Sequence, residues 1–337
     1  MGKLLLSAFF CVCFSGVAIA QLPSQLPTKS SKIYANSADK RLSDEFNGKE
    51  VNWAKWNRRM DGGVGIEDYV TDGSLVVMES EECNGEHVEY VSMKATTIDG
   101  KPRTAGLVGE TSGHFGFYTV RFRFKGLNTE DVKKNMTIWH PSVWSSVFTH
   151  QTFDREAKIS GDNLNWLEID LMEWETGLNS WSCDAPARFT DSKGEMRRAV
   201  RSGEDMEKAM IKECEDRDHE QWTTLGLEYA DTHMKLWEWI DGKWVDISDR
   251  EVKIIDDNLE CPEKSFTPSS IARSVCKPMY WIVGGVVSRF LYPSIQDGTC
   301  THSLADAQFD YDFFRYYPLK SIENEHWAWR EGLEFAE

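Results

Sequence analysis

The stretch Glu168-Ile169-Asp170-Leu171-Met172-Glu173 combines a short apolar run with three carboxylates and is flanked by tryptophans. Side chains alternate across a β-strand, so Glu168 and Asp170 share one face while the apolar residues between them point into a core. Glu173 has the opposite parity, and a regular strand would turn it away from the other two. A β-bulge near Leu171 adds one residue and returns Glu173 to the acidic face. The stretch therefore predicts a bulged strand with three carboxylates on one surface.

Crowded carboxylates have a chemical consequence, because like charges a few ångströms apart raise the pKa of at least one of the carboxyl groups. Two carboxyls with different pKa values can serve as a nucleophile and a general acid. Retaining glycoside hydrolysis needs such a pair at a separation of about 5 to 5.5 Å. Strand geometry separates the backbones of Glu168 and Glu173 by roughly 13 Å, so both side chains must lean toward a common sugar. The alternative is an edge strand whose acidic face is solvated.

The acidic stretch resembles the bulged active-site signature of glycoside hydrolase family 16, which includes laminarinases, agarases, porphyranases and carrageenases. Other segments resemble strands of that family in the same order along the chain. They are Asp44 to Trp56, Gly116 to Phe122, Trp139 to Trp144, His219 to Gly242, and Asp310 to Tyr317. The resemblance implies an all-β fold, a jelly-roll sandwich with a concave substrate cleft.

The resemblance also implies a role for each carboxylate. Glu168 is expected to be the nucleophile that forms a glycosyl-enzyme ester, and Glu173 to protonate the leaving oxygen and then activate water. Asp170 lies between them and is expected to hold their protonation states apart. All three residues are present, which favours an active glycosidase over a non-catalytic carbohydrate-binding protein on the same fold, the alternative of a different class.

Aromatic residues of the matching segments are candidates for substrate binding. Trp144 occupies an aromatic position of the family and is expected to form a sugar platform, with a core tryptophan as the alternative. Trp166 has the parity of Glu168 and is expected to face the cleft. His219 falls where the family has a cleft histidine, although the family's tyrosine three positions later is Trp222 here.

Two residues of the opening segment, Trp56 and Arg58, are expected to line one end of the cleft. For Arg58 and its neighbour Arg59 the alternative is a solvated surface, where most charged residues lie. None of these side chains forms a pattern of metal ligands. We expect no metal and no cofactor, and no residue pattern indicates a structural calcium.

The substrate is expected to be a polysaccharide, cleaved internally. Two departures from the family's glucanases favour a marine galactan, as in agarases. Leu167 replaces the glycine that usually precedes the first catalytic glutamate, and Trp281 to Val287 replaces an N-L-A-V-G-G-like strand. A laminarinase-type β-1,3-glucanase remains the alternative.

Both chain ends differ in composition from the expected catalytic domain at 41–320. Residues 1–20 carry Lys3, an apolar run and Ala18-Ile19-Ala20, which predicts a cleaved secretory signal and hence an extracellular protein. Residues 21–40 predict an extended leader, and residues 321–337 a helical or frayed tail. No other apolar run is long enough to span a membrane.

A charged segment near 190–220 interrupts the strand pattern. Its part from Gly203 to Glu213 has the apolar spacing of an amphipathic helix, expected to pack near one end of the cleft. The alternative is a solvated loop that never meets substrate.

Charge and cysteine content restrict the partners. The net charge of -17 disfavours nucleic acid and a densely sulfated polysaccharide, and we expect a monomer. An even number of cysteines remains after the signal, which predicts disulfides in a secreted chain. These cysteines are Cys83, Cys183, Cys214, Cys261, Cys276 and Cys300.

Overall fold

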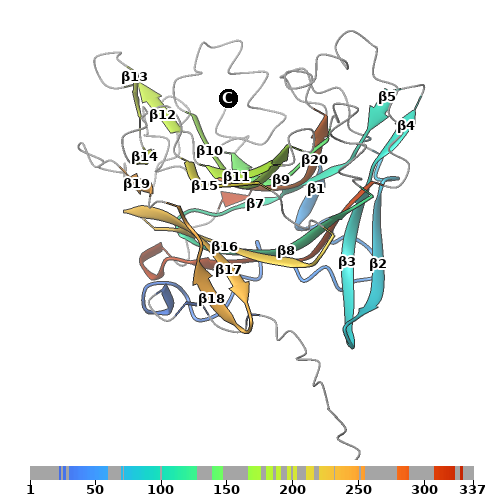
Figure 1. Ribbon diagram of the computed structural model, residues 1–337, viewed down its shortest axis with the longest axis horizontal. Coiled ribbons are helices and arrows are strands. Elements are labelled where there is room, and N and C mark those ends of the chain that lie inside the picture. The colour runs from blue at the N-terminus through green and yellow to red at the C-terminus, as the bar shows by residue number, and fades with distance from the viewer. Residues whose placement is uncertain are drawn as a thin grey trace, which may run out of the picture.

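The computed structural model shows a β-sandwich of two nine-stranded antiparallel sheets (Figure 1). It describes residues 23, 26–27, 30–59, 70, 72–98, 101–126, 139–146, 166–175, 180–184, 187–190, 196–198, 200–202, 210–215, 220–230, 232–249, 252–254, 279–287, 307–322 and 327–328. The predicted all-β fold is confirmed. Within these residues no helix is long and apolar enough to cross a membrane.

We call the sheet that contains the acidic strand the front sheet. Its order is β1 (Trp56–Arg58), β6 (Gly106–Gly109), β20 (Tyr280–Val287), β9 (Trp139–Ser146), β10 (Trp166–Glu175), β11 (Ser180–Asp184) and β15 (Met210–Glu215). A further hairpin, β12 (Ala187–Thr190) and β13 (Met196–Arg198), pairs with the start of β10. The acidic stretch thus lies on an inner strand of the sheet and not at its edge.

The back sheet packs against the front sheet. Its order is β14 (Val200–Ser202), β19 (Val252–Ile254), β17 (His233–Ile240), β16 (Thr223–Tyr229), β8 (Gly116–Lys125), β21 (Gln308–Pro318), β3 (Glu86–Lys94) and β2 (Val76–Cys83), with β18 (Lys243–Asp246) beside β17. Two small sheets complete the fold: β4 (Thr96–Ile98) with β5 (Lys101–Arg103), and β7 (Thr111–Ser112) with β22 (Trp327–Ala328).

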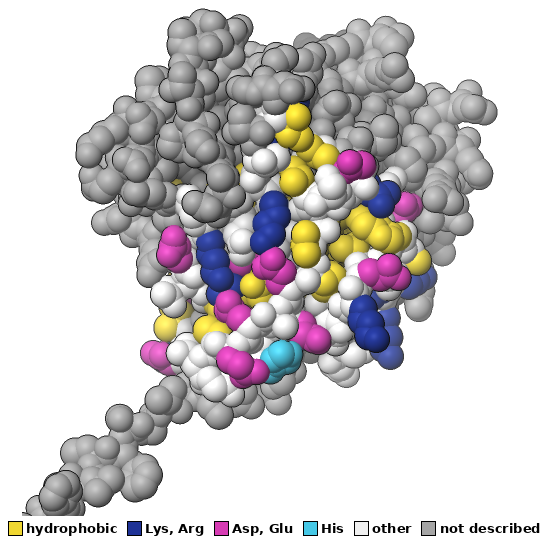
Figure 2. Space-filling model, turned by 90° about the vertical axis from the view of Figure 1, so that its right-hand side faces the viewer, with side chains coloured by type: hydrophobic (Ala, Val, Ile, Leu, Met, Phe, Trp, Pro, Cys, Tyr) yellow, Lys and Arg dark blue, Asp and Glu magenta, His cyan; other side chains and the backbone are white. Residues whose placement is uncertain are grey.

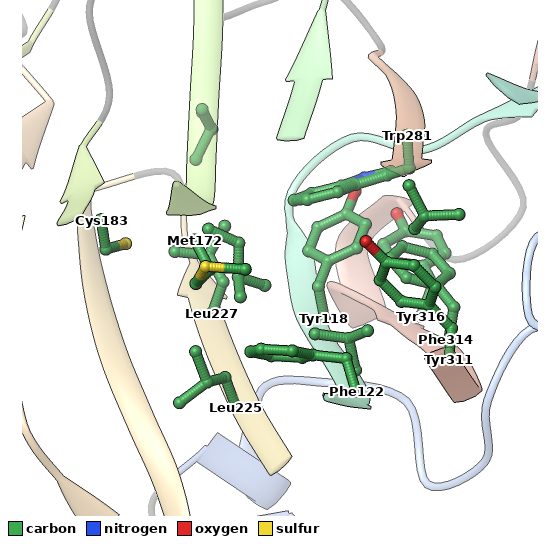
Figure 3. Close-up of a cluster of buried hydrophobic side chains, with 14 of the residues drawn as sticks. Tyr118, Phe122, Met172, Cys183, Leu225, Leu227, Trp281, Tyr311, Phe314 and Tyr316 are labelled. Atoms are coloured by element: carbon green, nitrogen blue, oxygen red, sulfur yellow. The ribbon is translucent and has the colours of Figure 1, made fainter. Parts of the chain in front are cut away.

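The core between the sheets is rich in aromatic residues. Side chains of β8 alternate between the two faces of the back sheet, so every second residue of β8 points into this core. The rings of Tyr118 and of Trp281 on β20 lie 4.4 Å apart and are tilted by 37°, and Phe124 meets Trp174 of β10 edge to face at 6.4 Å. Figure 3 shows Tyr118 and Trp281 facing each other across the core, with Met172 nearby. The residues of β8 between the inward-pointing ones point to the other side, so Arg121 and Arg123 lie on the outer face of the back sheet.

The folded unit begins before residue 41, so the expected extended leader is wrong from Ser30 onward. Ser30–Lys32 forms a 3-10 turn, and Tyr34 is fully buried and bridges to Leu319. The Ser30 hydroxyl donates a hydrogen bond to Glu228 at 3.1 Å. The buried ring of Tyr34 and the hydrogen bond to Glu228 hold this segment against the back sheet. Residues 1–20 lie outside the described residues.

The predicted helix from Gly203 to Glu213 is also wrong where the structure describes it. Met210–Glu215 forms β15, which pairs with β11 at the edge of the front sheet. Ile211 is fully buried, and its carbonyl accepts a hydrogen bond from the backbone of Asp249 at 2.9 Å. Pairing to a sheet edge and burial of one apolar side chain outweigh the weak helical preference of this segment.

The C-terminal tail was expected to be helical or frayed, and this is wrong for the part of residues 321–337 that the structure describes. Trp327–Ala328 forms β22 and pairs with Ser112 and Thr111 of β7. A short strand preceded by a 3-10 turn at Lys320–Ile322 continues the fold beyond residue 320.

Candidate active site

A bulge interrupts the pairing of β10 at the position that the sequence predicts. Asp170 pairs with Trp144 of β9, whereas Met172 pairs with Val143, so Leu171 is the extra residue. The pairing with β11 shifts between the same residues, from Asp170 to Glu173. An extra residue on one strand is the defining feature of a β-bulge.

The bulge brings the three carboxylate positions into phase. Across β9, positions 168, 170 and 173 pair with residues 146, 144 and 142. Those partners are spaced two apart, and directly paired residues of antiparallel strands share a face of the sheet. Positions 168, 170 and 173 therefore lie on one face of the front sheet, at evenly spaced register positions.

Burial supports this assignment for the residues whose side chains are described. Ile169, Leu171, Met172 and Trp174 are all buried in the core. Glu173, between two buried neighbours, is half-buried. Asp170 is 3% exposed, so its carboxyl is held in a largely water-free setting. The side chain of Glu168 is not among the parts that the structure describes.

A fourth acidic position neighbours this face, which the sequence analysis missed. Asp184 of β11 is the direct partner of Asp170, and Ser182 is the partner of Glu173. The spacing of these partners places positions 182 and 184 on the acidic face as well. No local pattern in the sequence reveals this pairing, because it depends on the register between β10 and β11.

Cys183 lies beneath the acidic face and takes no part in nucleophilic chemistry. It is fully buried and has a free thiol. Burial raises the pKa of this thiol, and the negative charge of Glu173 raises it further. A thiol held protonated is a poor nucleophile.

Cys83 is the other free cysteine in the described part of the chain, and it is half-buried at the end of β2. The predicted disulfides stay a prediction, now restricted to the remaining four cysteines. In the same part of the chain no group of three or more His, Cys, Asp or Glu side chains could hold a metal ion.

Trp56 does not line the cleft, which corrects the expectation for this residue. Its side chain is 2% exposed and packs between Phe46 and Phe314, at 5.5 and 6.1 Å. The indole N–H donates to Asp44 at 2.9 Å. Trp56 is a core residue that connects the opening segment to the back sheet, so it offers no ring face to a sugar.

The two arginines after Trp56 differ in environment. Arg58 is half-buried, and its guanidinium lies 4.1 Å from the ring of Trp53, which is 37% exposed. Arg59 is 2% exposed, so the solvated-surface alternative is wrong for this residue. Arg58 lies on β1, at the edge of the front sheet opposite to β15.

The other expected binding residues lie beside β10 or outside the described residues. Position 144 is the partner of Asp170, on the acidic face, and position 166 pairs with Arg188 of β12. The side chains at both positions, and all of His219, lie outside the description. Trp222 is placed by the structure, but on the outer face of the back sheet, where its indole N–H donates to Glu81 of β2 at 3.2 Å.

The fold is that of glycoside hydrolase family 16 enzymes. LamAcat from Zobellia galactanivorans has 15% identity and a TM-score of 0.52, over 86% of this chain and 99% of that chain. Porphyranase B from the same organism has 14% identity and a TM-score of 0.52, over 84% and 92% of the two chains. A family 16 enzyme of the mixed-linkage glucan locus of Bacteroides ovatus has 9% identity and a TM-score of 0.52, over 82% and 99%.

Comparison of the amino-acid sequence alone finds no such similarity. No family model matches the chain, and no curated protein matches it. The similarity to these enzymes is therefore one of fold, at 9 to 15% sequence identity.

Proposed function

We propose that the protein is a secreted, endo-acting glycoside hydrolase that cleaves a β-linked polysaccharide with retention of configuration. The observation that carries the proposal is the bulge at Leu171, which brings positions 168, 170 and 173 onto one face of an inner strand. Solved structures with the same fold include a laminarinase from Flavobacterium sp. UMI-01 and a porphyranase, which supports a polysaccharide as substrate.

We assign to each carboxylate the role that the resemblance to family 16 implies. Glu168 attacks the anomeric carbon, while Glu173 gives a proton to the leaving oxygen and later takes one from water. Asp170 is buried between these positions. Its proposed role is to supply negative charge between the two glutamates and to help position them.

The preferred substrate in this proposal is a neutral marine galactan such as agarose, with a laminarin-type β-1,3-glucan as the alternative. The net charge of -17 supports a neutral chain over a sulfated one. Trp144 is proposed as a sugar platform, because position 144 pairs directly with Asp170. Trp166, His219 and Arg58 are proposed as further contacts along the cleft.

The test is incubation of the pure protein with agarose, porphyran, carrageenans, laminarin and mixed-linkage glucan, followed by product sizing. An endo-acting hydrolase releases short oligosaccharides from one of them, whereas Glu168→Gln releases none. If no polysaccharide is cut but the wild type binds one of them, the non-catalytic carbohydrate-binding alternative replaces this proposal.

A further inference from the structure

The outer face of the back sheet carries an aromatic and charged cluster far from the acidic strand. Trp222 lies at the start of β16 and is half-buried. Its ring centroid lies 4.3 Å from the guanidinium carbon of Arg123 and 5.2 Å from that of Arg121. Tyr90 of β3 meets the same ring edge to face at 5.4 Å. We call these four residues the Trp222 cluster.

Ion pairs hold both arginines in place under the indole. Arg123 donates to Asp310 at 2.9 Å and forms a two-pronged pair with Glu81, whose second bond is 2.7 Å long. Arg121 donates to Asp312 at 2.9 Å. Bidentate and charge-assisted bonds fix guanidinium planes firmly. Since the indole N–H is also bound to Glu81, the ring of Trp222 is immobilised.

Part of the Trp222 side chain remains accessible in the part of the chain that the structure describes, where this residue is half-buried. Arg121 and Arg123 are two residues apart on β8, so both approach the ring from the sheet side. Because two arginines contact the ring, the partial exposure of Trp222 belongs to the part of the ring that they do not cover. An immobilised aromatic face loses little conformational entropy when a ligand stacks on it.

The surroundings of the ring can accept hydrogen bonds from hydroxyl groups. Glu86 and Glu79 border the cluster, with side chains 23% and 29% exposed. Basic and acidic groups are intermixed on this part of the molecule, because Arg121, Arg123 and Lys125 are each paired with a carboxylate. Figure 2, which views the side where β2 and β3 lie, shows the two kinds of charge interspersed. Such a surface favours a neutral ligand over an anionic one.

We propose that the Trp222 cluster is a second, non-catalytic binding site for a neutral polysaccharide chain. The apolar face of a sugar ring stacks on the indole, and its hydroxyls donate to Glu79 and Glu86. The inference rests on the proposed function for the identity of the ligand. A second site on the sheet behind the cleft holds the enzyme on a long chain while the cleft acts on another part of it.

The binding test uses native gel electrophoresis through agarose-derived oligosaccharide, laminarin or mixed-linkage glucan, in the Glu168→Gln background. Trp222→Ala is expected to weaken retardation about tenfold, which corresponds to about 1.4 kcal/mol. Trp222→Phe keeps an aromatic face and is expected to retain most of the binding. Ile240→Ala removes an exposed apolar side chain of the back sheet outside the cluster and is the control. Equal retardation of Trp222→Ala and its parent overturns the proposal.

A second measurement does not depend on the stability of the alanine variant. In protein labelled with 5-fluorotryptophan, the Trp222 resonance is assigned by its loss in Trp222→Phe. Added oligosaccharide is expected to shift this resonance, and no shift at saturation overturns the site. Cleavage assays separate this proposal from the first one. A Trp222-dependent shift without any cleavage contradicts the hydrolase alone, whereas cleavage without the shift contradicts only the second site.

Discussion

Asp170 and Glu173 lie three residues apart on β10, yet they pair with residues 144 and 142 of β9, which lie only two apart. The difference is the bulge at Leu171, and it is what puts both carboxylates on the same face. On the core side of the bulge, the side chains of Leu171 and Met172 are both buried. A local irregularity of the strand thus produces the arrangement that acid/base chemistry needs.

Replacing Glu173 is expected to affect natural and activated substrates differently. Glu173→Ala lowers turnover of the polysaccharide by several orders of magnitude, because the leaving oxygen is no longer protonated. An aryl β-glycoside with a good leaving group needs no proton in the first step, so its glycosylation rate changes little. Stopped-flow burst kinetics measure this step. An equal loss on both substrates contradicts the acid/base role.

Replacing Asp170 by asparagine is expected to shift the pH profile more than the maximal rate. The amide has nearly the same shape but carries no charge, so the electrostatic environment of both glutamates changes. The pH optimum of kcat/KM is then expected to move. Because Asp170 is 3% exposed, thermal unfolding of Asp170→Asn is measured alongside. An unchanged profile with reduced stability indicates a purely structural role.

Gly284 of β20 is expected to tolerate no side chain. Its φ angle is +142°, and an added Cβ would lie 2.7 Å from the carbonyl oxygen of Ala105. Gly284→Ala should lower the free energy of unfolding by about 2 to 4 kcal/mol, measured by urea titration. Gly85→Ala is the matched control, since its φ is +81° but nothing lies within 4 Å of the added atom. That variant should lose only about 1 kcal/mol. Equal losses would show that the contact with Ala105 is unimportant.

Stability at low pH is expected to depend on Glu81. The hydrogen bonds from Arg123 lower the pKa of Glu81 to about 2, against the opposing effect of burial. A carboxyl with a depressed pKa in the folded state contributes stability above its ordinary pKa, which is lost as the pH falls toward 2. Glu81→Gln should therefore cost about 1 to 2 kcal/mol at pH 7, and this difference should vanish near pH 2.

The control for Glu81 is Glu82→Gln on the same strand. The Glu82 side chain is 72% exposed and pairs with His87 at 2.8 Å. Exposed ion pairs contribute little, so this variant should stay within about 0.5 kcal/mol of the wild type at every pH. If Glu82→Gln is as unstable as Glu81→Gln, then the buried pair with Arg123 is not the cause.

Local patterns in the sequence predicted the sandwich and the bulged strand, because alternation and like-charge crowding act over a few residues. Trp56 and Met210 to Glu213 were assigned wrongly, because their environment comes from distant partners. Phe314 covers Trp56, and β11 supplies the pairing that turns the second segment into a strand. Likewise, only the register between β10 and β11 reveals that Asp184 is the partner of Asp170.

Chemical rescue tests the nucleophile directly. Glu168→Gly lacks the attacking oxygen, so turnover should fall by several orders of magnitude while the fold persists, because position 168 lies on the face opposite to the buried Ile169. Azide or formate can enter the vacated space and attack the anomeric carbon, giving partial recovery on an activated substrate and an inverted product. The wild type should release a first product that keeps the β configuration, as seen by early-time NMR. An inverted product from the wild type rules out a double displacement. If azide or formate rescues Glu173→Ala with an inverted product but does not rescue Glu168→Gly, then the two assigned roles are exchanged.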